Sequence, residues 1–253
     1  MLGRRKLSKL ARRYEEQREA LDRDGYLIVD PAVDEQTLDR AASDMLPEFY
    51  EGDPAPFSVR DGGRIQDGWK SSEAVKAIAL APPVLDLLRG VYEREPLPFQ
   101  TLNFKVGTQQ PAHSDTIHFN SEPPGFMCGV WTALEDIDMD NGPLVYYPGS
   151  HKLREEKMGD AGLRASADDY PGYEEHIRGV IEREGLSPEY GTIKKGQALL
   201  WASNLLHGGA PQNDPGRTRL SQVTHYFFEG CDYYVPMLSE GDQIAPREFQ
   251  TIG

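Results

Sequence analysis

Residues 127–147, with the sequence MCGVWTALEDIDMDNGPLVYY, decide the fold class of this chain. Two short apolar runs lie at the start and end of this stretch, and Asp140-Asn141-Gly142 lies between them. An Asn-Gly pair between two strand-like runs is the strongest short-range signal for a tight β-hairpin turn. We therefore predict two antiparallel strands joined as a hairpin.

Runs of the same kind continue through the second half of the chain. They are short, apolar or alternating, and separated by turn residues, which is the pattern of an antiparallel β domain. The predicted strands are 99–106, 113–119, 127–135, 143–147, 191–194, 197–201 and 219–228. Residues 151–190 interrupt them with a polar, charged and aperiodic stretch. An insertion of that length is typically a functional lid or binding loop.

The chain before residue 99 is mainly helical in pattern. The predicted helices are one that ends at Gly25, one capped by Asp34, and one that is opened by Ser71 or Ser72 and resumes after Pro82–Pro83. A short strand-like run, 26–29, follows the first helix, and a loop rich in Gly, Pro and Asp covers 51–68.

Composition excludes several classes of protein. The 253 residues are 38% hydrophobic and 27% charged, which excludes a membrane protein, a fibre and a disordered chain. The net charge of −14 argues against a nucleic-acid partner, because that binding is mostly cation to phosphate. No uncharged apolar run approaches ~18 residues, so we expect no membrane-spanning helix. Two cysteines, Cys128 and Cys231, are no disulfide framework and fit a reducing cytoplasm.

Positive charge is concentrated at the N-terminus. Residues 1–23 hold eight Lys or Arg against four acids, so the rest of the chain carries −18. This basic segment has two interpretations, a docking arm for an anionic partner or the solvated face of a terminal helix. It lacks the apolar stretch of a secretory signal, and we expect a cytoplasmic protein.

The residues that indicate chemistry begin with His113 and Asp115. In a strand, residues i and i+2 point to the same face, so this imidazole and this carboxylate are expected side by side. His207 is the best third candidate, because it follows an apolar strand and precedes two glycines at which the backbone can turn sharply. Two imidazoles and one carboxylate on one face of an octahedron form the site of non-haem Fe(II) oxygenases.

A second feature that such an enzyme needs is also present. Enzymes of this kind usually take two electrons from 2-oxoglutarate, whose distal carboxylate needs a cationic fork that Arg supplies best. Arg219 lies twelve residues after His207 at the start of a strand-like run, and Ser221 falls on the same face. Arg217 has the same parity and remains an alternative to Arg219.

At this point the sequence resembles a known family, the phytanoyl-CoA dioxygenase (PhyH) family of Fe(II)/2-oxoglutarate oxygenases. The matching stretches are 24–29, 103–107, 110–115, 131–151, 195–209 and 219–226. The resemblance implies a double-stranded β-helix, that is, a jelly-roll or cupin-like fold with N-terminal helices.

The resemblance also implies roles for individual residues. His113, Asp115 and His207 match the iron ligands, and Arg219 matches the 2-oxoglutarate clamp. Residues at positions that often line the cosubstrate pocket are Asn103, Trp131 and Thr132. Relatives that halogenate replace the carboxylate by a small residue, so Asp115 favours hydroxylation.

The expected reaction is oxidation of a small-molecule metabolite at an unactivated C–H bond, with O2 and 2-oxoglutarate as cosubstrates and release of succinate and CO2. Candidate substrate contacts are Lys105, His118, Phe119 and Phe126. His118 has the opposite parity to His113, which argues against a fourth ligand. No basic cluster for the phosphates of coenzyme A is evident. The oligomeric state stays open.

We predict one catalytic domain, 1–253, that is mainly β with flanking helices (α+β). Its parts are a mainly helical segment, 1–95, a β core, 96–230, and a C-terminal tail, 231–253. Two alternatives remain. A cupin-like metal-dependent isomerase or hydrolase would use the same ligands but would not bind 2-oxoglutarate. A non-catalytic β-sandwich binding module would take up no specific metal.

Overall fold

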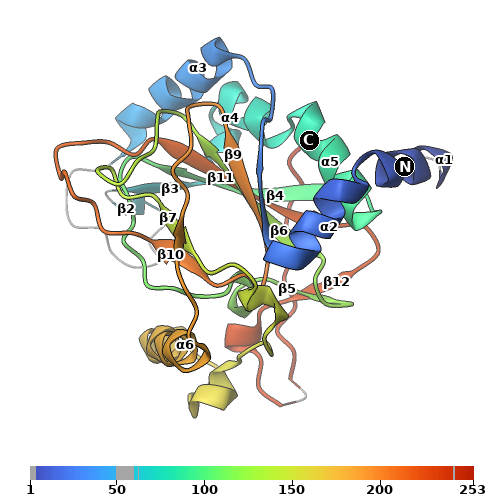
Figure 1. Ribbon diagram of the computed structural model, residues 1–253, viewed down its shortest axis with the longest axis vertical. Coiled ribbons are helices and arrows are strands. Elements are labelled where there is room, and N and C mark those ends of the chain that lie inside the picture. Colours follow the sequence, from blue (N-terminus) through green and yellow to red (C-terminus); the bar gives the residue numbers. More distant parts are fainter. Residues whose placement is uncertain (1–3, 50–59, 62, 242) are drawn as a thin grey trace.

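The computed structural model describes residues 4–49, 60–61, 63–241 and 243–253. Its helices are α1 Arg4–Arg13, α2 Glu15–Asp24, α3 Glu35–Met45, α4 Glu73–Ala79, α5 Pro82–Tyr92 and α6 Tyr170–Glu184. Its strands are β1 Tyr26–Val29, β2 Arg60–Asp61, β3 Arg64–Gln66, β4 Pro96–Phe104, β5 Asn120–Glu122, β6 Met127–Ala133, β7 Leu144–Tyr146, β8 Glu189–Tyr190, β9 Ala198–Ala202, β10 His207–Gly209, β11 Ser221–Phe228 and β12 Asp232–Tyr234. Helices α1–α5 lie along one side of the strands, and α6 lies at the opposite end (Figure 1).

The strands form antiparallel sheets that enclose a cavity. The largest sheet has seven strands in the order β1-β9-β6-β11-β4-β3-β2, and a second has three in the order β10-β7-β8. Residues from β3, β4, β6, β9 and β11 line the cavity together with residues from β7 and β10. Two antiparallel sheets around an interior site are the jelly-roll architecture, which confirms the predicted fold class.

The predicted hairpin at Asp140-Asn141-Gly142 is wrong. Strand β6 pairs with β9 and β11, whereas β7 pairs with β10 and β8, so the turn carries the chain from one sheet to the other. The Asn141 side chain holds this crossing, because its Nδ2 donates to the main-chain oxygens of Asp136 (3.0 Å) and Thr218 (3.1 Å). The local turn signal was correct, but the partner strands lie far away in sequence.

The helical part follows its local signals. Gly25 ends α2 with a φ of 84°, the left-handed conformation that glycine adopts without cost. The Asp34 side chain accepts a hydrogen bond from the Thr37 N–H at 2.9 Å and caps α3. The cap of α4 is Ser72, which accepts from the Val75 N–H.

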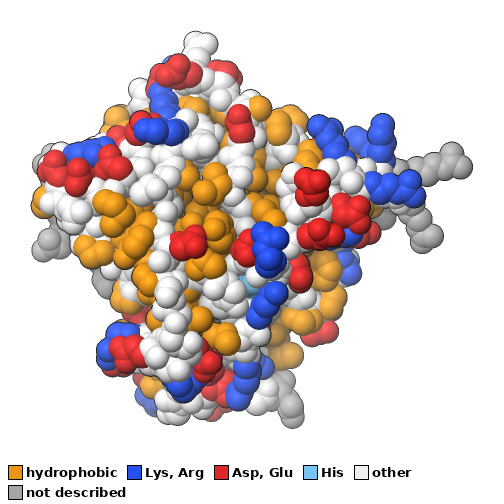
Figure 2. Space-filling model, in the orientation of Figure 1, with side chains coloured by type: hydrophobic (Ala, Val, Ile, Leu, Met, Phe, Trp, Pro, Cys, Tyr) orange, Lys and Arg blue, Asp and Glu red, His pale blue; other side chains and the backbone are white. Residues whose placement is uncertain are grey.

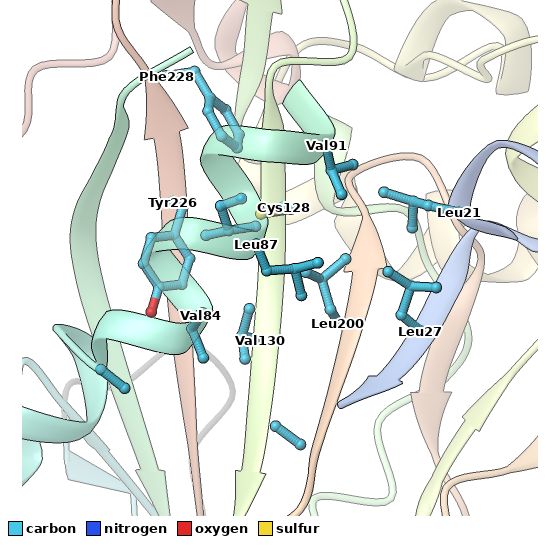
Figure 3. Close-up of a cluster of buried hydrophobic side chains, with 13 residues drawn as sticks. Leu21, Leu27, Val84, Leu87, Val91, Cys128, Val130, Leu200, Tyr226 and Phe228 are labelled. Carbon is cyan, nitrogen blue, oxygen red and sulfur yellow. The ribbon is translucent and has the colours of Figure 1, made fainter. Parts of the chain in front are cut away.

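A large apolar cluster joins α5 to the outer face of the seven-stranded sheet. Leu87 and Leu88 of α5 and Val130 and Leu200 of the sheet are all buried in it. Figure 3 shows the α5 side chains directed toward β6 and the neighbouring strands. Each such buried side chain contributes about 1.5–3 kcal/mol relative to exposure, so this cluster fixes the sheet that carries the cavity on its other face.

Other sequence predictions need correction. Of the predicted strand 113–119, only His113 makes a bridge, and η3 Asp115–Ile117 is a 3-10 turn; 191–194 is not a strand either. The insertion 151–190 is not aperiodic, because it contains α6, which buries Tyr170, Tyr173, Ile177 and Val180. The predicted loop 51–68 includes β3, and its residues 51–59 and 62 lie outside the described part.

The N-terminal helix α1 packs on the body of the protein. Leu10 and Ala11 are buried, and a Cβ placed on Gly90 of α5 would lie only 2.8 Å from the Leu10 main-chain oxygen.

Basic and acidic side chains are interspersed over the face shown in Figure 2. Within the described residues, no helix has the length and apolarity needed to cross a membrane.

Candidate metal centre

Backbone pairing brings the two candidate histidines together. The His113 N–H donates to the His207 carbonyl oxygen at 2.9 Å, and the His207 N–H donates to the His113 carbonyl oxygen at 3.0 Å. Asp115 then opens the turn η3, with Ser114 as its cap. The side chains of His113 and Asp115 therefore converge through this turn and not through strand alternation, which corrects the predicted geometry.

The three side chains point ligand atoms at one place. One ligand atom from each of His113, Asp115 and His207 lies within 4.8 Å of the other two, and all three residues are buried. Asp115 Oδ1 is 3.8 Å from His113 Nε2 and 3.7 Å from His207 Nε2. Two imidazoles and a carboxylate at these separations suit a divalent first-row metal ion.

Hydrogen bonds orient each of these groups. His113 Nδ1 lies 3.0 Å from the Pro111 carbonyl oxygen, and His207 Nδ1 lies 2.9 Å from the Leu205 carbonyl oxygen. A carbonyl can only accept, so each Nδ1 carries the hydrogen and each Nε2 presents a lone pair. The Trp201 indole N–H donates to Asp115 Oδ2 at 2.7 Å and leaves Oδ1 facing the histidines.

The electrostatic environment keeps the groups in the form that binds metal. Burial, with a further contribution from His207, lowers the pKa of His113 to about 3, so its imidazole is neutral at neutral pH. Burial acts to raise the pKa of Asp115, but the nearby histidines and the Trp201 hydrogen bond outweigh it, and the net shift is downward. A neutral imidazole and an ionised carboxylate need not lose protons before they bind a cation.

Arg219 lines the same cavity as these ligand atoms. It is 3% exposed, its guanidinium lies 5.3 Å from the ring centroids of Phe104 and Trp131, and burial lowers its pKa to about 10. Its Nε has no hydrogen-bond partner among the described residues, and Nη2 makes only a 3.4 Å contact with the Val106 carbonyl oxygen. The charge of Glu135 acts on Arg219, but the guanidinium forms no ion pair with a described residue, and such a buried cation fits the distal carboxylate of 2-oxoglutarate.

Arg217 lies elsewhere. Its Nη1 donates to both carboxylate oxygens of Asp138, at 2.8 and 2.9 Å, and 35% of its side chain is exposed. It is not among the cavity-lining residues, so the geometry favours Arg219 as the clamp.

The other predicted cosubstrate residues lie on two different faces of the seven-stranded sheet. Trp131 lines the cavity, and Ser221 is fully buried with its hydroxyl 3.4 Å from the Arg219 carbonyl oxygen. Asn103 and Thr132 both pair with Gln222, which places them on the opposite face of the sheet. There the Asn103 amide donates to Gln222 Oε1, so neither residue reaches the cavity.

The predicted substrate contacts also divide. His118 and Phe119 line the cavity. Phe126 instead packs beside Tyr92 and Phe228 in the apolar cluster under α5. Lys105 is not among the lining residues, and its carbonyl oxygen accepts the Arg219 N–H at 2.8 Å.

Sequence reasoning missed His225. Its Nε2 lies 3.8 Å from Asp115 Oδ2, and its Nδ1 lies 3.0 Å from Gln100 Oε1. His225 lies an even number of residues after Arg219 and Val223, which also line the cavity. Strand alternation could therefore have predicted that its side chain points to the same face.

The insertion 151–190 and the C-terminal segment 231–253 contribute differently to the cavity. No residue of 151–190 is among the lining residues, but Tyr170 lies 4.9 Å from the His118 ring and accepts a hydrogen bond from Gln110. The segment 231–253 is more than a tail, because it contributes Val235, Met237, Leu238 and Arg247 to the lining. The cavity has a volume of about 360 Å³, near the lower end of ligand pockets.

Two solved structures are similar in fold to this chain. The non-heme alpha ketoglutarate dependent epimerase SnoN from nogalamycin biosynthesis has a TM-score of 0.67 and 19% identity, with 98% of each chain covered. EctD from S. alaskensis with bound Fe has a TM-score of 0.65 and 21% identity, with 92% of this chain and 86% of that chain covered. At these low identities, the TM-scores show a shared fold and no more.

Sequence comparison identifies the family. Peroxisomal phytanoyl-CoA dioxygenase of Rattus norvegicus is 29% identical over 146 residues, 56% of this chain and 40% of that protein. Phytanoyl-CoA dioxygenase domain-containing protein 1 of Mus musculus is 32% identical over 101 residues, 38% of this chain and 34% of that protein. The chain thus spans less than half the length of these relatives. The family model for phytanoyl-CoA dioxygenase matches residues 21–219, and the chain belongs to the phytanoyl-CoA dioxygenase (PhyH) family.

Proposed function

We propose that the chain is an Fe(II)- and 2-oxoglutarate-dependent dioxygenase that hydroxylates a small molecule at an unactivated C–H bond. The observation that carries this proposal is one cavity that is lined both by the converging residues His113, Asp115 and His207 and by Arg219, whose guanidinium forms no ion pair with a described residue. Family membership supports it.

In this proposal His113 Nε2, His207 Nε2 and Asp115 Oδ1 would hold the metal ion. When bound, Fe(II) supplies the reduction of O2 coupled to decarboxylation of 2-oxoglutarate to succinate and CO2, and the substrate leaves as an alcohol. Arg219 binds the distal carboxylate of 2-oxoglutarate through a bidentate pair. The Phe104 and Trp131 rings beside Arg219 exclude water and strengthen that pair.

We also propose that the whole chain acts as one catalytic domain in the cytoplasm. The support for one domain is that Arg64, the three candidate metal ligands, Arg219 and residues of the segment 231–253 line a single cavity. The support for the location is that Cys128 and Cys231 are both free thiols. Fractionation of cells that produce the tagged protein tests this location against a peroxisomal one.

The test is an anaerobic titration of the protein with Fe(II) and 2-oxoglutarate, followed by the visible iron-to-keto-acid charge-transfer band. We expect the band in the parent protein and its loss in His207→Ala. Arg219→Ala should weaken 2-oxoglutarate binding far more than Fe(II) binding, whereas Arg217→Ala serves as the matched control and should change neither. A folded protein without the band would refute the proposal.

The two alternatives give different results in the same titration. A cupin-like isomerase or hydrolase would bind a metal ion but show no 2-oxoglutarate binding that depends on Arg219. A binding module would show no metal binding that depends on His207, so His207→Ala would change nothing.

A further inference from the structure

The cavity has a second cationic wall besides Arg219. Arg64 of β3 and Arg247 of the C-terminal segment both line it, although they are 183 positions apart in the chain. Arg219 already accounts for the distal carboxylate of 2-oxoglutarate in the proposed function. Arg64 and Arg247 thus add two further guanidinium groups to the lining, and the inference below rests on that proposed function.

Both arginines line the cavity together with His118 and His225, and their charges act on both imidazoles. Burial is the main cause of the low pKa values of His118 and His225, about 4 each, and the charges of Arg64 and Arg247 add to both shifts. His225 is itself 3.8 Å from Asp115. The two guanidinium groups thus act on the same side of the cavity that adjoins the candidate metal centre.

Two contacts fix Arg247 in this wall. Its main-chain N–H donates to the Tyr233 carbonyl oxygen at 2.8 Å, and its guanidinium lies 5.0 Å from the Phe119 ring centroid. The strand β12 that contains Tyr233 pairs with β5, so the segment is tied to the body of the protein. Arg247 is therefore a built part of the cavity.

The positive charge of Arg247 is not neutralised by the described residues. Its Nε is buried and has no hydrogen-bond partner among them, and burial lowers the pKa of Arg247. The acid whose charge acts on it is Asp67, which already accepts from Lys70 Nζ and Trp69 Nε1 at 3.2 Å each. A partly buried guanidinium in this state gains most from an anionic ligand.

Apolar side chains line the cavity as well, beside the polar residues Gln66 and Gln100. Val235, Met237 and Leu238 line it from the C-terminal segment, and Leu102 and Val223 line it from the sheet. About 360 Å³ must hold both 2-oxoglutarate and the reacting part of the substrate, which is too small to enclose an acyl-CoA. The lining therefore fits a small molecule with an anionic head and an apolar body.

We propose that the substrate is a small amphipathic anion. Its carboxylate or phosphate binds Arg64 and Arg247, and its apolar body packs against Met237 and Leu238. This arrangement holds the molecule beside His225 and the metal ligands, so the C–H bond that reacts lies on the apolar body and not on the head group.

The experiment compares three probes that share one phenyl ring: phenylacetate, phenyl phosphate and the neutral phenylacetamide. Calorimetric titration under anaerobic conditions uses protein with Fe(II) and saturating 2-oxoglutarate, and the same protein without them. We expect one anion to bind at least about tenfold more tightly than phenylacetamide, the ratio that a charge-assisted hydrogen bond gives. The better of the two anions distinguishes a carboxylate from a phosphate head.

Three variants locate the binding. Arg64→Gln and Arg247→Gln should each lower the preference for the anion about tenfold, and Arg247→Lys should retain part of it. Arg217→Gln, an arginine paired with Asp138 outside the cavity, should leave the preference unchanged. Thermal unfolding of each variant shows whether it is folded.

Equal binding of the three probes, or binding of none, overturns the proposal. An unchanged preference for the anion in both Arg64→Gln and Arg247→Gln overturns it as well. Loss of 2-oxoglutarate binding in Arg64→Gln but not in Arg219→Gln also overturns it, because the wall would then be the cosubstrate clamp. The proposed function fails separately, through absence of the charge-transfer band, while the anion preference of the metal-free protein still tests the wall.

Discussion

Replacing Trp201 by phenylalanine should weaken Fe(II) binding without unfolding the protein. The change removes the indole N–H that donates to Asp115 Oδ2 at 2.7 Å. The acceptor is buried, because Asp115 is only 4% exposed. A hydrogen bond to a buried charged group contributes about 1.5–3 kcal/mol. At 1.4 kcal/mol for each factor of ten, the affinity for Fe(II) should fall about 10- to 100-fold.

The loss falls on metal affinity because only the metal-bound state needs a fixed carboxylate. In the metal-free variant Asp115 can rotate, because no metal ion holds Oδ1 between His113 Nε2 and His207 Nε2. With the metal bound, Oδ1 must stay between the two candidate histidine ligands, so Oδ2 keeps its position without a donor. Trp201 is thus a positioning residue that acts through Asp115.

Trp131→Phe is the matched control. Trp131 lines the same cavity and is equally buried, but its indole nitrogen has no hydrogen-bond partner among the described residues. Anaerobic calorimetric titration with Fe(II) measures both variants, and thermal unfolding shows that both are folded. If Trp201→Phe binds Fe(II) within twofold of the parent, or if Trp131→Phe loses as much affinity, the reasoning is refuted.

Two further predictions concern stability. Burial lowers the pKa of His225 from 6.5 to about 4, so the native state binds fewer protons than the unfolded chain, and stability should fall as the pH drops from 6.5 to 4. Urea unfolding of the metal-free protein should show this loss of stability, and His225→Gln should remove roughly 3 kcal/mol of it. If the free energy of unfolding depends on pH in the same way in His225→Gln and in the parent protein, the prediction is wrong. In Gly129→Ala, the new Cβ would lie 2.3 Å from the Trp201 ring. Thermal unfolding should show a cost of about 1–3 kcal/mol, and undiminished stability with unchanged Fe(II) affinity would argue against it.

Sequence alone could predict what depends on neighbours along the chain. The cap at Asp34 and the left-handed Gly25 follow from a few adjacent residues, and the structure confirms both. The turn at Asn141-Gly142 was also local, but which strands it joins depends on pairings of β6 and β7 with distant partners. The hairpin prediction failed at that step, because turn chemistry does not specify the sheet.

The same distinction holds for the site. The residues His113, Asp115 and His207 could be selected by type and order, yet their geometry arises from a backbone bridge between residues 94 positions apart. Arg247 reaches the cavity because β12 pairs with β5, a contact that no local pattern in 231–253 reveals. Residues held by such long-range pairings could not be found from periodicity.

Strand geometry alone shows that not all of the predicted cosubstrate contacts can line the cavity. Trp131 and Thr132 are consecutive in a strand, so their side chains must point to opposite faces, and the cavity can accept only one of them. The register then decides which one, because Trp131 lies opposite Val223 and Thr132 opposite Gln222. The same alternation along β11 places Val223 and His225 together in the lining. A family resemblance that matches consecutive residues to one pocket must therefore be checked against strand parity before roles are assigned.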